Sequence, residues 1–108
     1  MTVGSEYAVY GITTLLGGVW YYLLDDDRNP WPVWKPAPLF EVTDPHLPVE
    51  WTFGYHFWPD LDKMLVSWPE WSSDHYFYER LVDGEQAELE LFRGWVHELE
   101  PHKESYIR

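Results

Sequence analysis

The stretch DGEQAELELFRGWVHELEP (residues 83–101) decides the fold class. Good helix formers dominate residues 85–93. Asp83 can cap a helix with Gln86 as its capping-box partner, and Pro101 follows as a stop signal. We therefore predict a helix over residues 85–100.

A hairpin around Asp83-Gly84 is the alternative, because this pair is a strong two-residue turn signal. Such a hairpin would make the protein mostly β. It would also place Glu79 opposite Glu88, and like charges in that position repel. A helix over these residues would place its apolar side chains in one stripe, and Glu88 would fall within that stripe. This position counts against the helix at its start. The helix is favoured, and Ser73 can cap a second, shorter helix over residues 74–82.

Patterns typical of β-strands occupy most of the preceding sequence. The first two segments would form a hairpin at Gly17-Gly18, with a short helix over residues 5–16 as the alternative. Residues 25–38 contain four prolines and are expected to be extended without regular structure. The predicted strands are residues 6–13, 18–24, 38–45, 49–57 and 63–68.

Together these patterns predict a single α+β domain over residues 1–108. We expect an antiparallel sheet of about four to five strands with one or two C-terminal helices packed on one face. Residues 101–108 are expected to form a frayed tail.

The most regular strand pattern is VEWTFGYHF (residues 49–57). Its apolar residues alternate with Glu50, Thr52, Gly54 and His56. His56 therefore projects from the side opposite the aromatic residues, which indicates a surface histidine beside a polar turn.

The composition is acidic and aromatic, with a formal net charge of −12 and a 19% share of Phe, Trp and Tyr. Direct binding to nucleic acid is disfavoured, because it depends on Lys and Arg. The chain has no cysteine, which excludes disulfides and thiol nucleophiles. No apolar run is long enough to span a membrane, and no secretory signal is recognisable. We expect a cytoplasmic protein.

Two phrases of the form Trp-Pro-x-Trp stand at residues 31–34 and 68–71. Their indoles could pack in the core, or stiff loops could present them as binding anchors. Carboxylates close to each phrase would then meet cationic groups of a partner. The predicted partner-binding residues are Asp25, Asp26, Asp27, Trp31, Trp34, Asp60, Asp62, Trp68, Glu70 and Trp71.

No sequence motif indicates catalysis, so we expect neither an enzyme nor a cofactor. The Asp25–Asp27 cluster lacks the spacing of a calcium loop and is interpreted as a solvated turn. A metal-dependent hydrolase that uses His56, Asp60 and Asp62 is the weakest of the hypotheses.

The leading hypothesis is an inhibitor that binds a protein with a basic surface, such as a nuclease toxin. In size and composition the chain resembles the small, acidic, tryptophan-rich immunity proteins that neutralise bacterial toxins. This resemblance transfers no residues. The alternatives are a nucleic-acid mimic directed against a defence enzyme, and a module that binds carbohydrates or small molecules through exposed tryptophans. The oligomeric state is not predicted.

Overall fold

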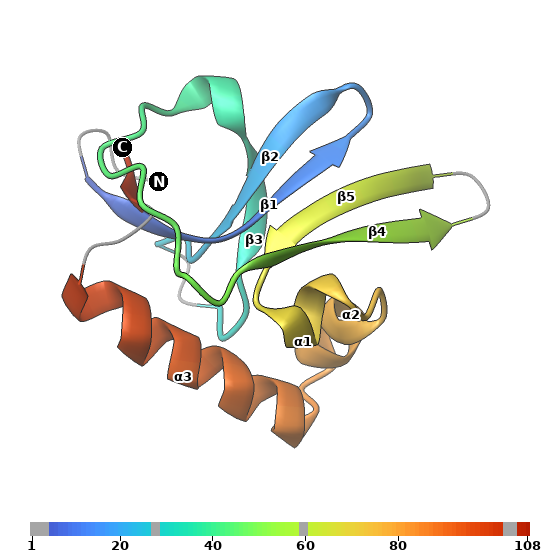
Figure 1. Cartoon of the computed structure of the whole chain (residues 1–108). Helices are drawn as coiled ribbons and strands as arrows, with labels where there is room; N and C mark the ends of the chain where they lie inside the picture. The colour runs from blue at the N-terminus through green and yellow to red at the C-terminus, as the bar shows by residue number, and fades with distance from the viewer. Residues whose placement is uncertain (1–4, 27–28, 59–60, 103–105) are drawn as a thin grey trace.

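The computed structural model describes residues 5–26, 29–58, 61–102 and 106–108. A six-stranded antiparallel sheet is packed against helices on one of its faces (Figure 1). The predicted α+β class is therefore confirmed. The sheet order is β3-β2-β1-β5-β4, and β6 pairs with the start of β1.

The first hairpin joins β1 (Tyr7–Leu15) to β2 (Gly18–Leu23). The alternative helix over residues 5–16 is wrong. Leu16 and Gly17 form the connection, and both have positive φ, 52° and 78°. This backbone matches the tight turns that join twisted strands, although it is unfavourable for Leu16.

The proline-rich segment contains more structure than predicted. Residues Val33–Pro36 form β3 on the edge of the sheet, and the short 3₁₀ helix η1 (Ala37–Leu39) follows. Edge strands tolerate proline because one side of their backbone needs no partner strand. The strand predicted over residues 38–45 is wrong, because η1 occupies its start and the rest forms an isolated bridge between Val42 and Ile107, with backbone hydrogen bonds to Tyr106 and Arg108 beside it.

The second hairpin joins β4 (Thr52–Trp58) to β5 (Leu61–Ser67). Strands β1 and β5 connect the two hairpins through a short ladder, with Ile12 opposite Val66 and Thr13 opposite Leu65. Side chains reinforce this junction. The Ser67 hydroxyl donates to the Tyr10 carbonyl at 2.7 Å, for example.

Three helices follow: α1 (Pro69–Ser72), α2 (Phe77–Val82) and α3 (Gln86–His102). The helix predicted over 85–100 is confirmed and the hairpin at Asp83-Gly84 is wrong. Arg80 explains why Glu88 is tolerated, because its Nε donates to the Glu88 carboxylate at 2.9 Å. Helix α1 was not predicted, and Ser73 ends it instead of capping α2.

The C-terminal residues that the structure describes are not frayed. Tyr106–Ile107 form β6, and both side chains are buried. Backbone bonds of 2.8 Å in both directions join Arg108 to Glu41. The prediction of a frayed tail is therefore wrong for these residues.

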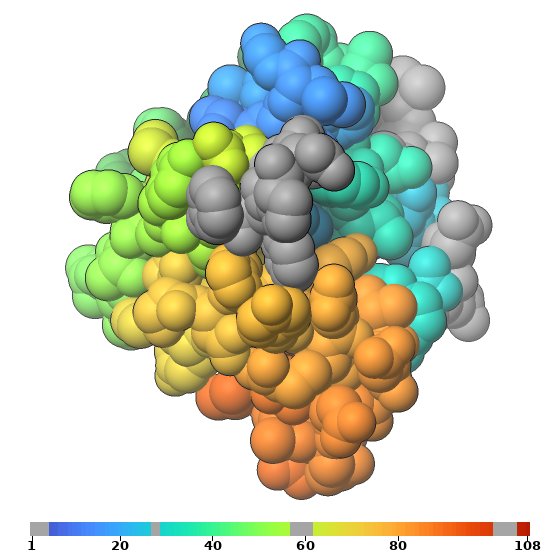
Figure 2. Space-filling view, turned by 90° about the vertical axis from the view of Figure 1, so that its right-hand side faces the viewer, coloured from blue at the N-terminus to red at the C-terminus, as the bar shows by residue number. Residues whose placement is uncertain are grey.

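Aromatic side chains fill the core between the sheet and the helices. Trp68 stacks on Trp95 with ring centroids 4.5 Å apart, and Trp71 meets Tyr22 edge-on at 4.7 Å. Figure 2 shows the atoms of α1 (yellow) packed against those of β4 (green). One face of the sheet is thus covered by helices.

Candidate protein-binding surface

The orientation of β4 decides which side chains the protein presents to solvent. Gly54 lies so close to α1 that an added Cβ would be 1.7 Å from the Ser72 carbonyl oxygen. Side chains alternate along a strand, so Thr52, Gly54 and His56 face the helices. Phe53 and Tyr55 therefore point away from the helices.

Polar side chains on the helix-facing side of β4 form hydrogen bonds to α1. His56 is 2% exposed, and its Nε2 donates to the Ser72 carbonyl at 2.9 Å. The Thr52 and Ser72 hydroxyls are 2.6 Å apart. Burial lowers the pKa of His56, because the charged imidazolium loses water. The prediction that His56 is a surface histidine is wrong.

The opposite side of the sheet carries an apolar surface that the helices leave uncovered. One row crosses four strands in register, with Phe53 opposite Val66, Val66 opposite Ile12 and Ile12 opposite Tyr21. Phe53 is 74% exposed and Tyr55 is 62% exposed. We call this surface the open face and define it as Ile12, Val19, Tyr21, Phe53, Tyr55, Met64 and Val66.

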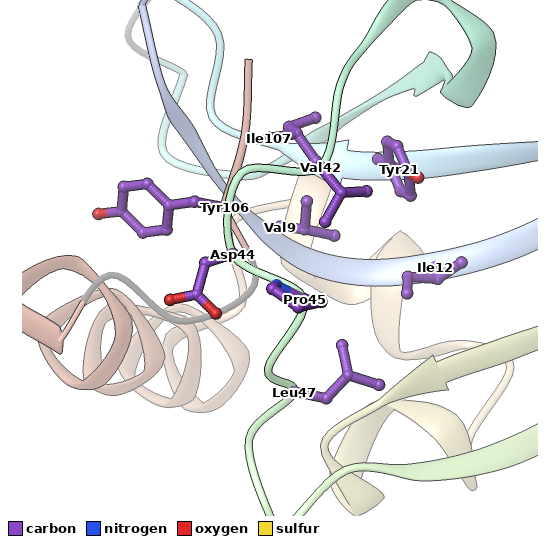
Figure 3. Close-up of a pocket in the computed structure, with 9 residues that line it drawn as sticks. All are labelled: Val9, Ile12, Tyr21, Val42, Asp44, Pro45, Leu47, Tyr106 and Ile107. Atoms are coloured by element: carbon purple, nitrogen blue, oxygen red, sulfur yellow. The ribbon is translucent and has the colours of Figure 1, made fainter.

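A pocket of about 260 Å³ adjoins the open face (Figure 3). Ile12 and Tyr21 contribute to it from the sheet, and Leu47 closes it from the segment that precedes β4. Asp44 also borders this pocket, but in Figure 3 its carboxylate points away from Ile12 and Tyr21. The interior is therefore apolar, and it suits an apolar group.

Carboxylates lie on the open face and on the segment that precedes β4. Asp62 lies on β5 next to Tyr55, and its hydrogen bond with the Tyr55 hydroxyl raises the pKa of that tyrosine. Glu50 precedes β4 and is exposed. Asp44 stays ionised more readily than an ordinary aspartate, because bonds from the His46 backbone and ring lower its pKa. An apolar centre with a negative rim is typical of protein-binding surfaces.

The second Trp-Pro-x-Trp phrase belongs to the core. Trp68 is 3% exposed and Trp71 is 1% exposed, so neither indole can reach a partner in this structure. The interpretation of these two residues as anchors is therefore wrong. Trp68 lies between the end of β5 and the start of α1, Trp71 lies in α1, and both are held between sheet and helices.

The first phrase is partly exposed. Trp31 is half-buried against the core, whereas Trp34 is 45% exposed at the edge strand β3. Trp34 already has neighbours on its faces, since Tyr22 stacks on it at 6.2 Å and the Lys63 ammonium lies 6.0 Å from its ring centre. Its side chain lies on the helix side of the sheet, away from the open face.

The predicted acidic residues do not form one cluster. The Asp25 carboxylate is only 9% exposed and lies 3.1 Å from the Lys35 ammonium, and Asp26 accepts a bond from Tyr7. Asp62 borders the open face, and Glu70 is exposed on α1. Asp27 and Asp60 lie outside the described residues. Asp25 is thus committed to an internal ion pair.

The structure separates the residues of the hydrolase hypothesis. His56 faces the helices, whereas Asp62 lies on the opposite side of the sheet. Among the described residues, no group of three or more His, Asp or Glu side chains is arranged to hold a metal ion.

Comparisons with family models, with characterised proteins and with solved structures found no match for the chain. None of the described helices combines the length and the hydropathy that a membrane span requires.

Sequence reasoning missed the aromatic residues that matter most for this surface. The alternation of residues 49–57 identified Phe53 and Tyr55 as one face of a strand. It did not show that this face is the exposed one. A signal was present in Gly54, because glycine within a strand often marks a close approach of another backbone.

Proposed function

We propose that the protein is a non-enzymatic inhibitor of the immunity type, which binds a partner protein with a basic surface through the open face. The observation that carries this proposal is the orientation of β4. Phe53 and Tyr55 on one side face solvent, while Gly54 and the buried His56 on the other side pack against α1. Exposed aromatic residues in a contiguous apolar patch are typical of interaction sites.

The charge of the protein supports a basic partner. A net charge of −12 on 108 residues attracts cationic surfaces and accelerates their encounter. Asp62 lies next to Tyr55 of the open face, and Glu50 is exposed in the segment just before β4, so both can pair with Lys or Arg of a partner. Phe53 and Tyr55 would supply the apolar contacts in its centre.

The test is a co-precipitation from native lysate at low and at moderate salt, with a matched pair of variants. Phe53→Ser removes an aromatic side chain from the open face. Leu39→Ser removes an equally exposed apolar side chain from η1, since the two residues are 74% and 73% exposed. We expect one basic protein to be captured stoichiometrically, to be released by salt, and to be lost only with Phe53→Ser.

The captured protein is then assayed for its own activity with and without the inhibitor. Suppression of that activity by the wild type, but not by Phe53→Ser, supports the proposal. A partner that binds both variants equally would contradict a role for the open face. A partner whose activity is unchanged would exclude inhibition.

A further inference from the structure

The two edges of the sheet differ in how they are protected against another strand. Strand β3 is four residues long, contains Lys35 and Pro36, and follows Pro32. Short length, lysine and proline are the usual means of blocking an edge. Strand β4 is seven residues long and contains no proline and no Asp, Glu, Lys or Arg.

The outer side of β4 has no partner strand among the described residues. A long, uncharged, aromatic edge is a template for pairing with another chain. Natural proteins rarely leave such an edge unprotected unless something covers it. We propose that β4 binds an extended segment of the partner as an additional strand of the sheet, and that this segment carries Lys or Arg at its ends.

The side-chain rows of the open face support this mode of binding. The row from Tyr21 through Ile12 and Val66 ends at Phe53, on the last strand of the sheet. A strand paired with β4 would place a side chain about 4.5–5.5 Å from Phe53 and continue the row. Alternate apolar side chains of the segment would then cover Phe53 and Tyr55.

Charge argues against a second copy of this chain as the occupant. Two copies would each bring a net charge of −12. Glu50 lies just before β4, and Asp62 pairs with Phe57 near the end of that strand. In an antiparallel pairing of two β4 strands, the start of one strand lies beside the end of the other. Glu50 of each copy would then lie towards Asp62 of the other copy. Like charges in such positions are destabilising, whereas Lys or Arg at the ends of a partner segment would pair with them.

The inference rests on the proposed function for the identity of the partner, but it can be tested without that partner. The probe is a terminally blocked peptide of alternating Val and Thr with a Lys at each end. Two further peptides carry N-methyl groups on alternate backbone nitrogens, one set for each edge of the peptide. N-methylation removes the main-chain donors and leaves the side chains in place.

We expect the parent peptide to bind and to protect from hydrogen exchange those amides of residues 52–58 that point away from β5. At least one N-methylated peptide should bind at least about tenfold more weakly, because strand addition depends on main-chain hydrogen bonds. A peptide with Glu at its ends should also bind more weakly. In the protein, Phe53→Lys should reduce binding and Leu39→Lys should not.

Several results would overturn the inference. If both N-methylated peptides bind as tightly as the parent peptide, the open face contacts the side chains of the peptide without strand pairing. Failure of every peptide to bind, while Phe53-dependent capture of a protein from lysate persists, would show that β4 accepts no strand although the proposed function stands. A Phe53-dependent dimer in sedimentation would make a second copy the occupant. Peptide binding without any captured inhibitor target would support the inference and contradict the proposed function.

Discussion

The close contact between β4 and α1 makes Gly54→Ala the most informative stability test. The new Cβ would lie 1.7 Å from the Ser72 carbonyl oxygen and 2.6 Å from its carbon, where real Cβ contacts essentially never fall below 3.0 Å. Both atoms belong to the backbone, so no rotamer change can relieve the overlap. Helix α1 must move away from the sheet.

The expected cost follows from what this movement breaks. Overpacking alone costs about 1–3 kcal/mol. Displacing Ser72 also breaks its bonds with His56 and Thr52, at 2.9 and 2.6 Å, and each is worth about 1 kcal/mol. We therefore expect Gly54→Ala to lower the free energy of unfolding by about 3–5 kcal/mol, a large part of the stability of a typical domain.

The same substitution at Gly94 is the matched control. This glycine lies within α3, has no atom near its missing Cβ, and is not in a positive-φ conformation. Gly94→Ala should raise stability by about 0.5–1 kcal/mol, since alanine loses less backbone entropy in a helix. Urea unfolding followed by tryptophan fluorescence measures both variants. If Gly54→Ala unfolds at the same urea concentration as the wild type, β4 does not face α1 as described.

Three further predictions concern stability. Burial lowers the pKa of His56, so the folded state favours the neutral imidazole. The stability that neutral His56 contributes should be fully present above pH 6.5, the ordinary pKa of histidine, and should be lost as the pH falls below that value. His56→Gln should flatten this dependence of the urea midpoint on pH, and an unchanged slope would refute the assignment. Trp68→Ala should cost about 3–5 kcal/mol and Trp34→Ala at most about 1 kcal/mol, as measured by urea unfolding; equal losses would contradict the burial of Trp68. Leu16→Asn should raise the melting temperature by relieving about 1 kcal/mol of strain at its positive φ, and a lower value would mean that the exposed Leu16 side chain is needed.

Local sequence signals predicted much of the secondary structure. The helix formers of residues 85–93 outweighed the turn signal at Asp83-Gly84, and α3 is the longest helix. Alternation predicted β4 and β5 to within a few residues, because the period of side chains along a strand is a local property. The hairpin of β1 and β2 followed from strand propensity and the glycines at 17 and 18.

The candidate site was predicted less well, since its residues depend on contacts between distant segments. Both Trp-Pro-x-Trp phrases have the same sequence pattern, yet Trp68 is buried and Trp34 is exposed. The Trp-Pro-x-Trp pattern itself does not distinguish the buried phrase from the exposed one. Trp68 precedes a helix that folds under the sheet, whereas Trp34 lies on an edge strand.

The sequence by itself determined the class of the fold, the positions of most strands and the negative charge of the protein. Only the tertiary structure decided which side of β4 faces solvent. Alternation divides a strand into two faces and carries no information about which face is covered. That choice was made by α1, which approaches the backbone at Gly54 and hydrogen-bonds to His56, and so leaves Phe53 and Tyr55 exposed.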